Sequence, residues 1–147
     1  MGTCKRVILF GSEGGAKMFS SATVRFDFPC HGDNPTNVFT LRDCVDTLVS
    51  VARWIRQDFP HVEDLCIFAS GFGAYVTLVA LEQLIALPGK VKLVVQTPSL
   101  RMGQTLLNMI RLSPETFRVM DRYTLRADRP FDVTYAFYQE LRSRHAL

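Results

Sequence analysis

The stretch that decides the fold is Leu65-Cys66-Ile67-Phe68-Ala69-Ser70-Gly71-Phe72-Gly73-Ala74, an apolar run that ends in a tight turn containing two glycines. A short apolar run bounded by turn residues is typical of a buried strand, here Leu65–Ala69. The residues from about 74 to 87 continue as a helix, which Pro88-Gly89 ends. The chain is therefore expected to pass from a strand into a helix through a very short bend.

Strand and helix signals alternate on both sides of this turn. The expected strands are Val7–Phe10, Thr23–Phe28 and Val91–Gln96. A helix from about 41 to 59 has apolar residues at every third or fourth position, with Thr40 as its N-cap. Strands that alternate with helices indicate right-handed crossovers and a parallel sheet of about four strands. Because the strands are short apolar runs, we expect helices on both faces, which makes a three-layer α/β fold.

The C-terminal third is expected to form a helical, lid-like tail. Leu106–Leu112 has helical apolar periodicity, and Ser113-Pro114-Glu115 combines an N-cap, a first-turn proline and a first-turn acid. A last helix is expected from about Thr134 to Arg144. We therefore predict a single domain, with a sheet core over residues 1–100 and a helical segment over 101–147.

Composition excludes several classes of function. The 147 residues are 48% apolar and 21% charged, which is typical of one globular domain. The net charge of +3 is scattered, so no nucleic-acid partner is expected. No apolar run reaches the roughly 18 residues that cross a bilayer, and the N-terminus lacks a signal-peptide pattern, so we expect a cytoplasmic protein without membrane contact.

The cysteines give no metal or cofactor signal. None of the four forms a Cys-x-x-Cys pair, and the three histidines are not spaced around them as ligands. Cys44 and Cys66 fall at apolar positions of an expected helix and strand, so they are predicted to be small buried hydrophobic residues.

The turn has the spacing of a nucleophile elbow, a small–x–nucleophile–x–small pattern in which strand and helix nearly touch. With Gly71 at the centre, the flanking residues are Ala69 and Gly73, which are both small. With Ser70 at the centre, both flanks are phenylalanines. Sterics therefore place Gly71 at the nucleophile position, where glycine tolerates an unusual backbone but has no side chain with which to attack.

Three segments resemble a known family. Val24–Asn34 resembles the RxDxxGHGxS stretch of the α/β-hydrolase superfamily, and Ile67–Tyr75 resembles the vGHSxGGy elbow of its bacterial cinnamoyl/feruloyl-esterase (acyl esterase) group. Pro130–Thr134 and the helix after it resemble the end of that group's lid insertion. The resemblance implies an α/β-hydrolase fold with a helical lid and the chemistry of a carboxylic ester hydrolase.

The departures from the family pattern concern that chemistry. Gly71 replaces the nucleophilic serine, and Gly11-Ser12 stands where the family has His-Gly at the oxyanion loop. Cys30 replaces a glycine of the first motif. The sequence also ends at Leu147, before the strands that carry the family's acid and catalytic histidine. The resemblance therefore implies a catalytically degenerate protein that acts by binding or association.

An enzymatic alternative stays open, namely a serine or cysteine ester hydrolase of low activity. Its nucleophile would be Ser70 or Cys30, or a partner chain would supply the missing acid and base. Cys30 lies beside His31, but adjacent residues rarely aim their side chains at each other. Ser12 has no evident base, and His145 has no later strand to hold it, so it is expected to be an exposed terminal residue.

Two nucleotide-binding patterns are incomplete. The Gly-x-Gly at 71–73 follows a strand, but Val76 stands where a dinucleotide fingerprint needs a third small residue. Gly11–Met18 has Lys17 placed as in a phosphate loop, but it lacks the second glycine and the magnesium-binding hydroxyl. No cofactor is therefore expected.

Binding and assembly give two further expectations. The pocket would be lined by the oxyanion-loop residues Gly11 and Ser12 and by Phe72 and Gly73, with a small carboxylate or ester as its ligand, because helix N–H groups favour anions. In the family the sheet continues past the strand that corresponds to Val91–Gln96. We therefore expect a homodimer or a partner chain at that edge or over the C-terminal helices.

Overall fold

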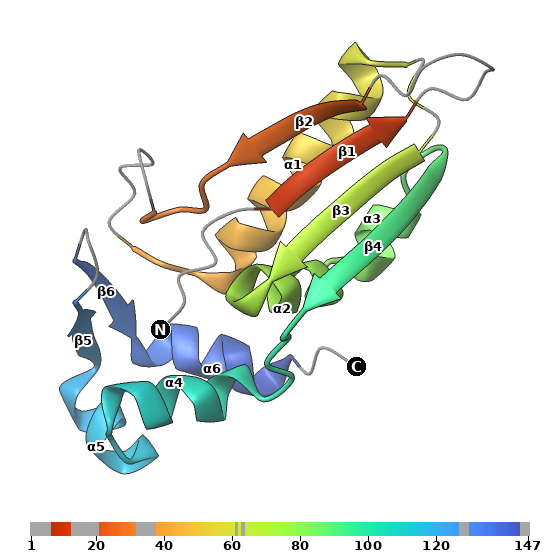
Figure 1. Cartoon of the computed structure of the whole chain (residues 1–147). Helices are drawn as coiled ribbons and strands as arrows, with labels where there is room; N and C mark the ends of the chain where they lie inside the picture. Colours follow the sequence, from red (N-terminus) through yellow and green to blue (C-terminus); the bar gives the residue numbers. More distant parts are fainter. Residues whose placement is uncertain are drawn as a thin grey trace.

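The fold is built on one mixed sheet. The computed structural model describes residues 7–12, 21–31, 38–60, 62, 64–126 and 130–144. Within them, β1 (Val7–Ser12), β2 (Ser21–Phe26), β3 (Asp64–Ser70) and β4 (Lys90–Gln96) form a sheet in the order β2-β1-β3-β4 (Figure 1). All four strands overlap the segments that the sequence predicts, so the α/β class is confirmed.

The expectation of a wholly parallel sheet was wrong, because β1 runs antiparallel to both of its neighbours. Among the four described strands of this sheet, β1 pairs antiparallel with both β2 and β3, whereas β3 and β4 pair in parallel. β1 extends to Ser12 and β2 begins at Ser21, so the connection is residues 13–20. That connection is shorter than the dozen or so residues that a parallel crossover needs, whereas an antiparallel pair can be joined by a short link.

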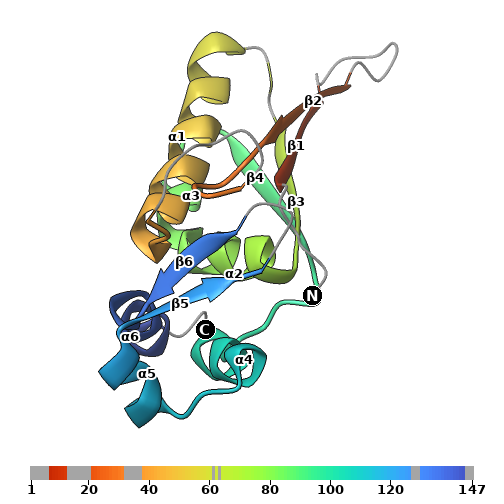
Figure 2. The ribbon, with the colours of Figure 1, turned by 90° about the vertical axis from the view of Figure 1, so that its left-hand side faces the viewer.

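The same change removes the expected third layer from the part of the chain that the structure describes. Both helical crossovers, from β2 to β3 and from β3 to β4, run in the same direction across the sheet. Crossovers of one hand that run in one direction put their helices on one face. Accordingly, α1 (Leu41–Asp58), α2 (Gly71–Val79) and α3 (Leu81–Ile85) all lie behind the strands in Figure 1 and to one side of the sheet in Figure 2.

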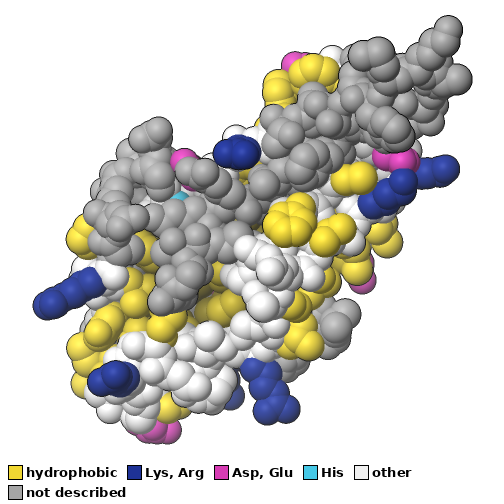
Figure 3. Space-filling model, viewed as in Figure 1, with side chains coloured by type: hydrophobic (Ala, Val, Ile, Leu, Met, Phe, Trp, Pro, Cys, Tyr) yellow, Lys and Arg dark blue, Asp and Glu magenta, His cyan; other side chains and the backbone are white. Residues whose placement is uncertain are grey.

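Burial along β3 reports this two-layer arrangement. Leu65, Ile67 and Ala69 face the helices and are fully buried, whereas Cys66 is half-buried and Phe68 is 36% exposed. The prediction of a buried Cys66 was therefore wrong, because its face of β3 carries no described helix. Figure 3 views this open face and shows apolar side chains interspersed with Lys and Arg.

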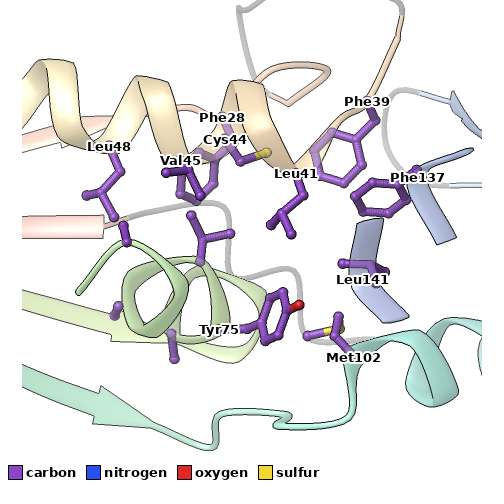
Figure 4. Packing of buried hydrophobic residues seen from close by; sticks show 14 of the residues in the cluster. Phe28, Phe39, Leu41, Cys44, Val45, Leu48, Tyr75, Met102, Phe137 and Leu141 are labelled. Carbon is purple, nitrogen blue, oxygen red and sulfur yellow. The ribbon is translucent and has the colours of Figure 1, made fainter. Parts of the chain in front are cut away.

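Helix α1 forms as its pattern predicts. The Thr40 side chain accepts a hydrogen bond from the backbone N–H of Asp43 at 3.0 Å, which satisfies one of the free donors at the helix start. One face of the helix is buried against α2 and the sheet; its buried residues are Leu41, Cys44, Val45, Leu48, Val49, Ala52 and Ile55. Figure 4 shows Leu41, Cys44, Val45 and Leu48 pointing from α1 into this core.

The connection from β3 to β4 starts earlier than expected and is broken. The helix begins at Gly71 rather than near Ala74, and α2 and α3 are separated at Ala80. Arg56 of α1 fixes the return to β4, because its guanidinium donates to the carbonyl oxygens of Val62 at 2.7 Å and Lys90 at 2.6 Å.

The C-terminal segment contains the predicted helices and an unpredicted hairpin. The helices are α4 (Met102–Ile110), α5 (Pro114–Met120) and α6 (Tyr135–Ser143). The N-cap at Ser113 is confirmed, since its hydroxyl accepts from the N–H of Thr116 at 3.1 Å. Between α5 and α6, β5 (Arg122–Leu125) and β6 (Phe131–Thr134) pair antiparallel, so the expectation of a wholly helical tail was wrong.

The C-terminal segment packs onto the sheet core as part of the same apolar cluster. That cluster runs without a break from Phe28 and α1 through α2 to α4 and α6. A backbone bridge between Val38 and Asp132 also joins β6 to the segment before α1. The C-terminal ends of β2 and β3 point towards this segment, which covers that end of the sheet (Figures 1 and 2).

Candidate functional site

The β3–α2 turn contains a left-handed residue, and that residue is Gly71. Its φ is 55°, whereas Ser70 before it is extended, with φ of −133° and ψ of 157°. Ala69 and Gly73, which flank it two positions away, are buried. A residue with a side chain rarely adopts a left-handed backbone, so glycine is the residue this bend favours. The apex of the turn thus carries no group that can act as nucleophile or base.

Ser70 is placed on the strand side of this bend. It is the last residue of β3 and the N-cap of α2, and it is half-buried. Its side chain accepts no capping hydrogen bond from the helix. The first N–H groups of α2 are therefore not satisfied by this residue, which is the usual source of such a bond.

The loop after β2 carries Cys30 and His31. Cys30 has a left-handed backbone, with φ of 64°, and it is only 3% exposed. The Nδ1 of His31 lies 2.9 Å from the carbonyl oxygen of Pro29, and since a carbonyl can only accept, Nδ1 must be the protonated donor. Cys30 is thus shielded from any substrate, and one nitrogen of His31 is engaged within its own loop.

Cys44 lies in the core close to this loop. It is fully buried, as predicted, and desolvation raises the pKa of its thiol well above the ordinary range. The Asp43 carboxylate and the neighbouring Cys30 and Glu140 add to that increase. Because the thiolate is the reactive form of cysteine, this thiol is inert at neutral pH.

Phe39 connects the two loops to the C-terminal segment. Its ring centre lies 5.2 Å from that of His31, 5.3 Å from Phe72, 5.2 Å from Phe131 and 4.8 Å from Phe137. Such distances and tilted orientations are those of packed aromatic pairs. The structure therefore brings His31 and Phe72 against the same ring, that of Phe39. Figure 4 shows this ring beside that of Phe137.

Two long-range hydrogen bonds hold α6 and the residue after it against α1 and α2. The Glu140 carboxylate accepts from the backbone N–H of Leu41 at 2.7 Å, at the positive end of α1. The buried Tyr75 hydroxyl donates to the carbonyl oxygen of Arg144 at 2.8 Å, and burial raises the pKa of Tyr75 to about 12. The segment predicted to be lid-like is therefore tied to α1 and α2 at two points.

Few local signals mark the residues that build this region. Phe39, Tyr75 and Glu140 are not among the predicted site residues. One usable signal exists for Phe39, which immediately precedes the N-cap of α1, because an apolar residue at that position often packs back onto its helix. No comparable local signal marks Tyr75 or Glu140, whose partners are distant in the sequence.

The predicted oxyanion loop is displaced into the sheet. Gly11 and Ser12 are the last residues of β1, and Gly11 is aligned with Ala22 on one side and Leu65 on the other. A strand flanked on both sides uses its N–H groups in the ladders, so they are not free to stabilise an oxyanion. Ser12 is aligned with Asp64, at the opposite end of β3 from Ser70, because β1 continues two residues beyond its apolar run and runs antiparallel to β3. Lys17, Asn34 and His145 lie outside the described residues.

The described ranges contain neither a metal cluster nor a membrane span. Among them, no group of three or more His, Cys, Asp or Glu side chains is placed to hold a metal ion. None of the helices described has both the length and the apolar character to span a bilayer. Comparisons of the chain with protein-family models, curated proteins and solved structures found no match.

Proposed function

We propose that this chain is a catalytically degenerate α/β-hydrolase-like protein that acts by binding or association rather than by hydrolysing esters. The observation that carries the proposal is Gly71, the left-handed residue at the strand-to-helix bend. Nucleophilic acyl transfer needs a hydroxyl or thiol held at such a position with a base in reach. Glycine offers a hydrogen there instead.

The surroundings of the turn support the same proposal. Cys30, the sharpest alternative nucleophile, is buried, and Nδ1 of His31 donates to Pro29. The ring of Phe72, the residue directly after the bend, packs against that of Phe39 with the ring centres 5.3 Å apart. An active site needs space for substrate next to its nucleophile, so this packing favours a non-catalytic role.

The ligand that we propose is a small carboxylate, or an ester bound through its carbonyl oxygen. The N–H groups at the start of α2 receive no bond from the Ser70 side chain. Helix N-termini carry partial positive charge and bind anions.

Ester turnover tests the proposal directly. Hydrolysis of p-nitrophenyl acetate and butyrate is measured for the wild-type chain and for a Ser70→Ala, Cys30→Ala double variant. We expect neither protein to exceed the buffer rate. Turnover by the wild type that the double variant loses would refute the proposal and support the low-activity ester hydrolase.

Ligand binding is tested by thermal unfolding in acetate, butyrate and benzoate, against chloride at equal ionic strength. A ligand that binds only the folded state at about 100 times its Kd stabilises it by about 2.7 kcal/mol. We expect a rise in Tm with an organic acid relative to chloride. Equal Tm values in all four salts would remove the carboxylate from the proposal.

A further inference from the structure

Strand β4 has one edge that no described strand covers. β4 pairs with β3 along its whole length, from Asp64 opposite Lys90 to Ser70 opposite Gln96. It is the last strand in the order β2-β1-β3-β4, and in Figure 1 no element lies beyond it. An uncovered strand edge presents N–H and C=O groups that can pair with another strand.

The helix-facing side of this edge is also incompletely covered. Val91, Leu93 and Val95 face the helices but are only half-buried, whereas the equivalent residues of β3 are fully buried. Helix α3 contacts β4 and carries Ile85, an apolar side chain that is largely exposed. Apolar surface that continues from a strand to its covering helix is typical of an interface between chains.

We propose that two copies of this chain pair antiparallel along β4, with Leu93 opposite Leu93 of the second copy. The apolar positions are symmetric about this residue, because Val91 then lies opposite Val95 on the helix side. A two-fold axis perpendicular to the sheet keeps the helices of both copies on one face, so the two half-covered apolar sides join into one. The dimer has a continuous eight-stranded sheet.

The lysines of β4 favour this register over one centred on Lys92. On the open face, a centre at Leu93 puts Lys92 opposite Val94 of the second copy and Lys90 opposite Gln96. Slipping the pairing by one residue, so that Leu93 lies opposite Val94 of the second copy, would bring the helix side of one copy against the open side of the other. A centre at Lys92 would set the two Lys92 side chains directly opposite each other, and like charges in that position are destabilising.

Lys92 is also neutralised within its own chain. Its ammonium group forms an ion pair with Asp64 of β3 on the same face. An incoming strand therefore meets a paired lysine rather than an isolated charge. The proposed dimer rests on the association part of the proposed function. It is tested by the mass of the protein and not by ester turnover, so either proposal can fail without the other.

The first experiment measures mass by light scattering with size-exclusion chromatography at about 10–100 µM, where a dimer with a Kd of roughly 1 µM is well populated. We expect the wild type to have twice the chain mass of 16.6 kDa. Val94→Lys places a lysine of each copy opposite Lys92 of the other copy. These two like-charge pairs should weaken the dimer about tenfold. Val94→Glu sets a carboxylate opposite Lys92 and should leave it intact. Val94 is 56% exposed, so neither variant should disturb the fold of one chain.

A matched control distinguishes this edge from general surface effects. Val119 is also apolar and is 83% exposed, and its helix, α5, lies far from β4 (Figure 1). Val119→Lys should keep the wild-type mass. A wild type with the mass of one chain at 100 µM would overturn the proposal, as would equal masses for Val94→Lys and Val94→Glu.

The second experiment tests the register. Opposed residues of antiparallel strands have Cα atoms about 4.5–5.5 Å apart, which suits a disulfide. Leu93→Cys should therefore form a covalent dimer on mild oxidation, beyond the level seen for the oxidised wild type. Val95→Cys, on the same side, should not, because its copies are about 13 Å apart in this register. Equal cross-linking of the two variants would refute the Leu93 centre.

Discussion

Replacing Gly71 by alanine and by asparagine tests whether the β3–α2 turn needs a left-handed backbone. The φ of 55° at Gly71 lies in the region where a Cβ atom crowds the following carbonyl oxygen. The cost for an ordinary L-residue is about 1–2 kcal/mol, so Gly71→Ala should lower the free energy of unfolding by that amount. Asparagine enters this region several-fold more readily than other residues, so Gly71→Asn should cost roughly half as much.

The two substitutions separate conformation from crowding. Asparagine is larger than alanine, so a turn limited by space would tolerate it less well. A turn limited by φ would tolerate asparagine better. The order glycine, asparagine, alanine in stability is therefore a signature of backbone conformation.

The assay is urea unfolding followed by far-UV circular dichroism, together with thermal melts. For a domain of about 150 residues, a loss of 1 kcal/mol lowers Tm by about 2–4 °C, so Gly71→Ala should melt roughly 2–8 °C below the wild type. Equal urea m-values would show that the same surface unfolds in each variant. If alanine costs nothing, or if asparagine costs more than alanine, Gly71 is not held left-handed and the argument for an empty nucleophile position fails.

Three further substitutions test the contacts around the turn. Tyr75→Phe removes the hydrogen bond to Arg144 and should cost about 1 kcal/mol at pH 7 in urea unfolding. Folding raises the pKa of the Tyr75 hydroxyl from 10.0 to about 12, so its contribution to the free energy of unfolding is complete below pH 10 and is lost as pH rises towards 12. The wild type should therefore lose more stability than Tyr75→Phe between pH 10 and about 12. Parallel pH profiles of the two proteins would contradict the burial of this hydroxyl. Glu140→Gln weakens the bond to Leu41 N–H and removes a negative charge from the start of α1, which should cost about 0.5–1 kcal/mol and less in 1 M salt; a loss independent of salt would argue against the helix-dipole part. Phe39→Ala should cost about 3–5 kcal/mol by calorimetry, because the ring is buried against four others, and a loss under 1 kcal/mol would mean that these rings do not pack as a unit.

Local signals in the sequence predict the elements of this fold well. The N-caps at Thr40 and Ser113 and the strand before Gly71 are confirmed because each depends on neighbouring residues only. A side chain that bonds a backbone N–H three residues later leaves its mark within four positions of the chain. Such signals are independent of how the elements are later arranged.

Such local signals predict neither the direction of a strand nor the presence of a short hairpin. An apolar run such as Val7–Phe10 reads the same in either direction, so the direction of β1 followed from the length of the link to β2. The hairpin β5–β6 has four residues in each strand and is supported by side-chain bonds from Arg122 and Thr124 to Asp132. Those bonds join positions eight and ten residues apart, which a search for periodicity cannot detect.

The candidate site shows the same division. The small-flank spacing around Gly71 is a local steric rule, and the left-handed residue in the structure is the one that this rule puts at the centre. The filling of the neighbouring space by Phe39 is not local, because Phe131 and Phe137 reach it from the far end of the chain. Sequence reasoning could therefore identify the residue at the centre of the bend, but it could not foresee which aromatic rings pack beside it.

Direction of the first strand also links the fold to the proposed dimer. With β1 reversed, its connection to β2 carries no described helix, and both helical crossovers fall on one face. The sheet is then covered on one side, and its last strand, β4, has apolar residues that α3 covers only in part. A two-layer sheet can gain coverage at such an edge by adding a second sheet of the same kind, since that extends both layers at once. The same feature that departs from the predicted three-layer fold is thus the physical reason to expect β4 to pair with a second copy.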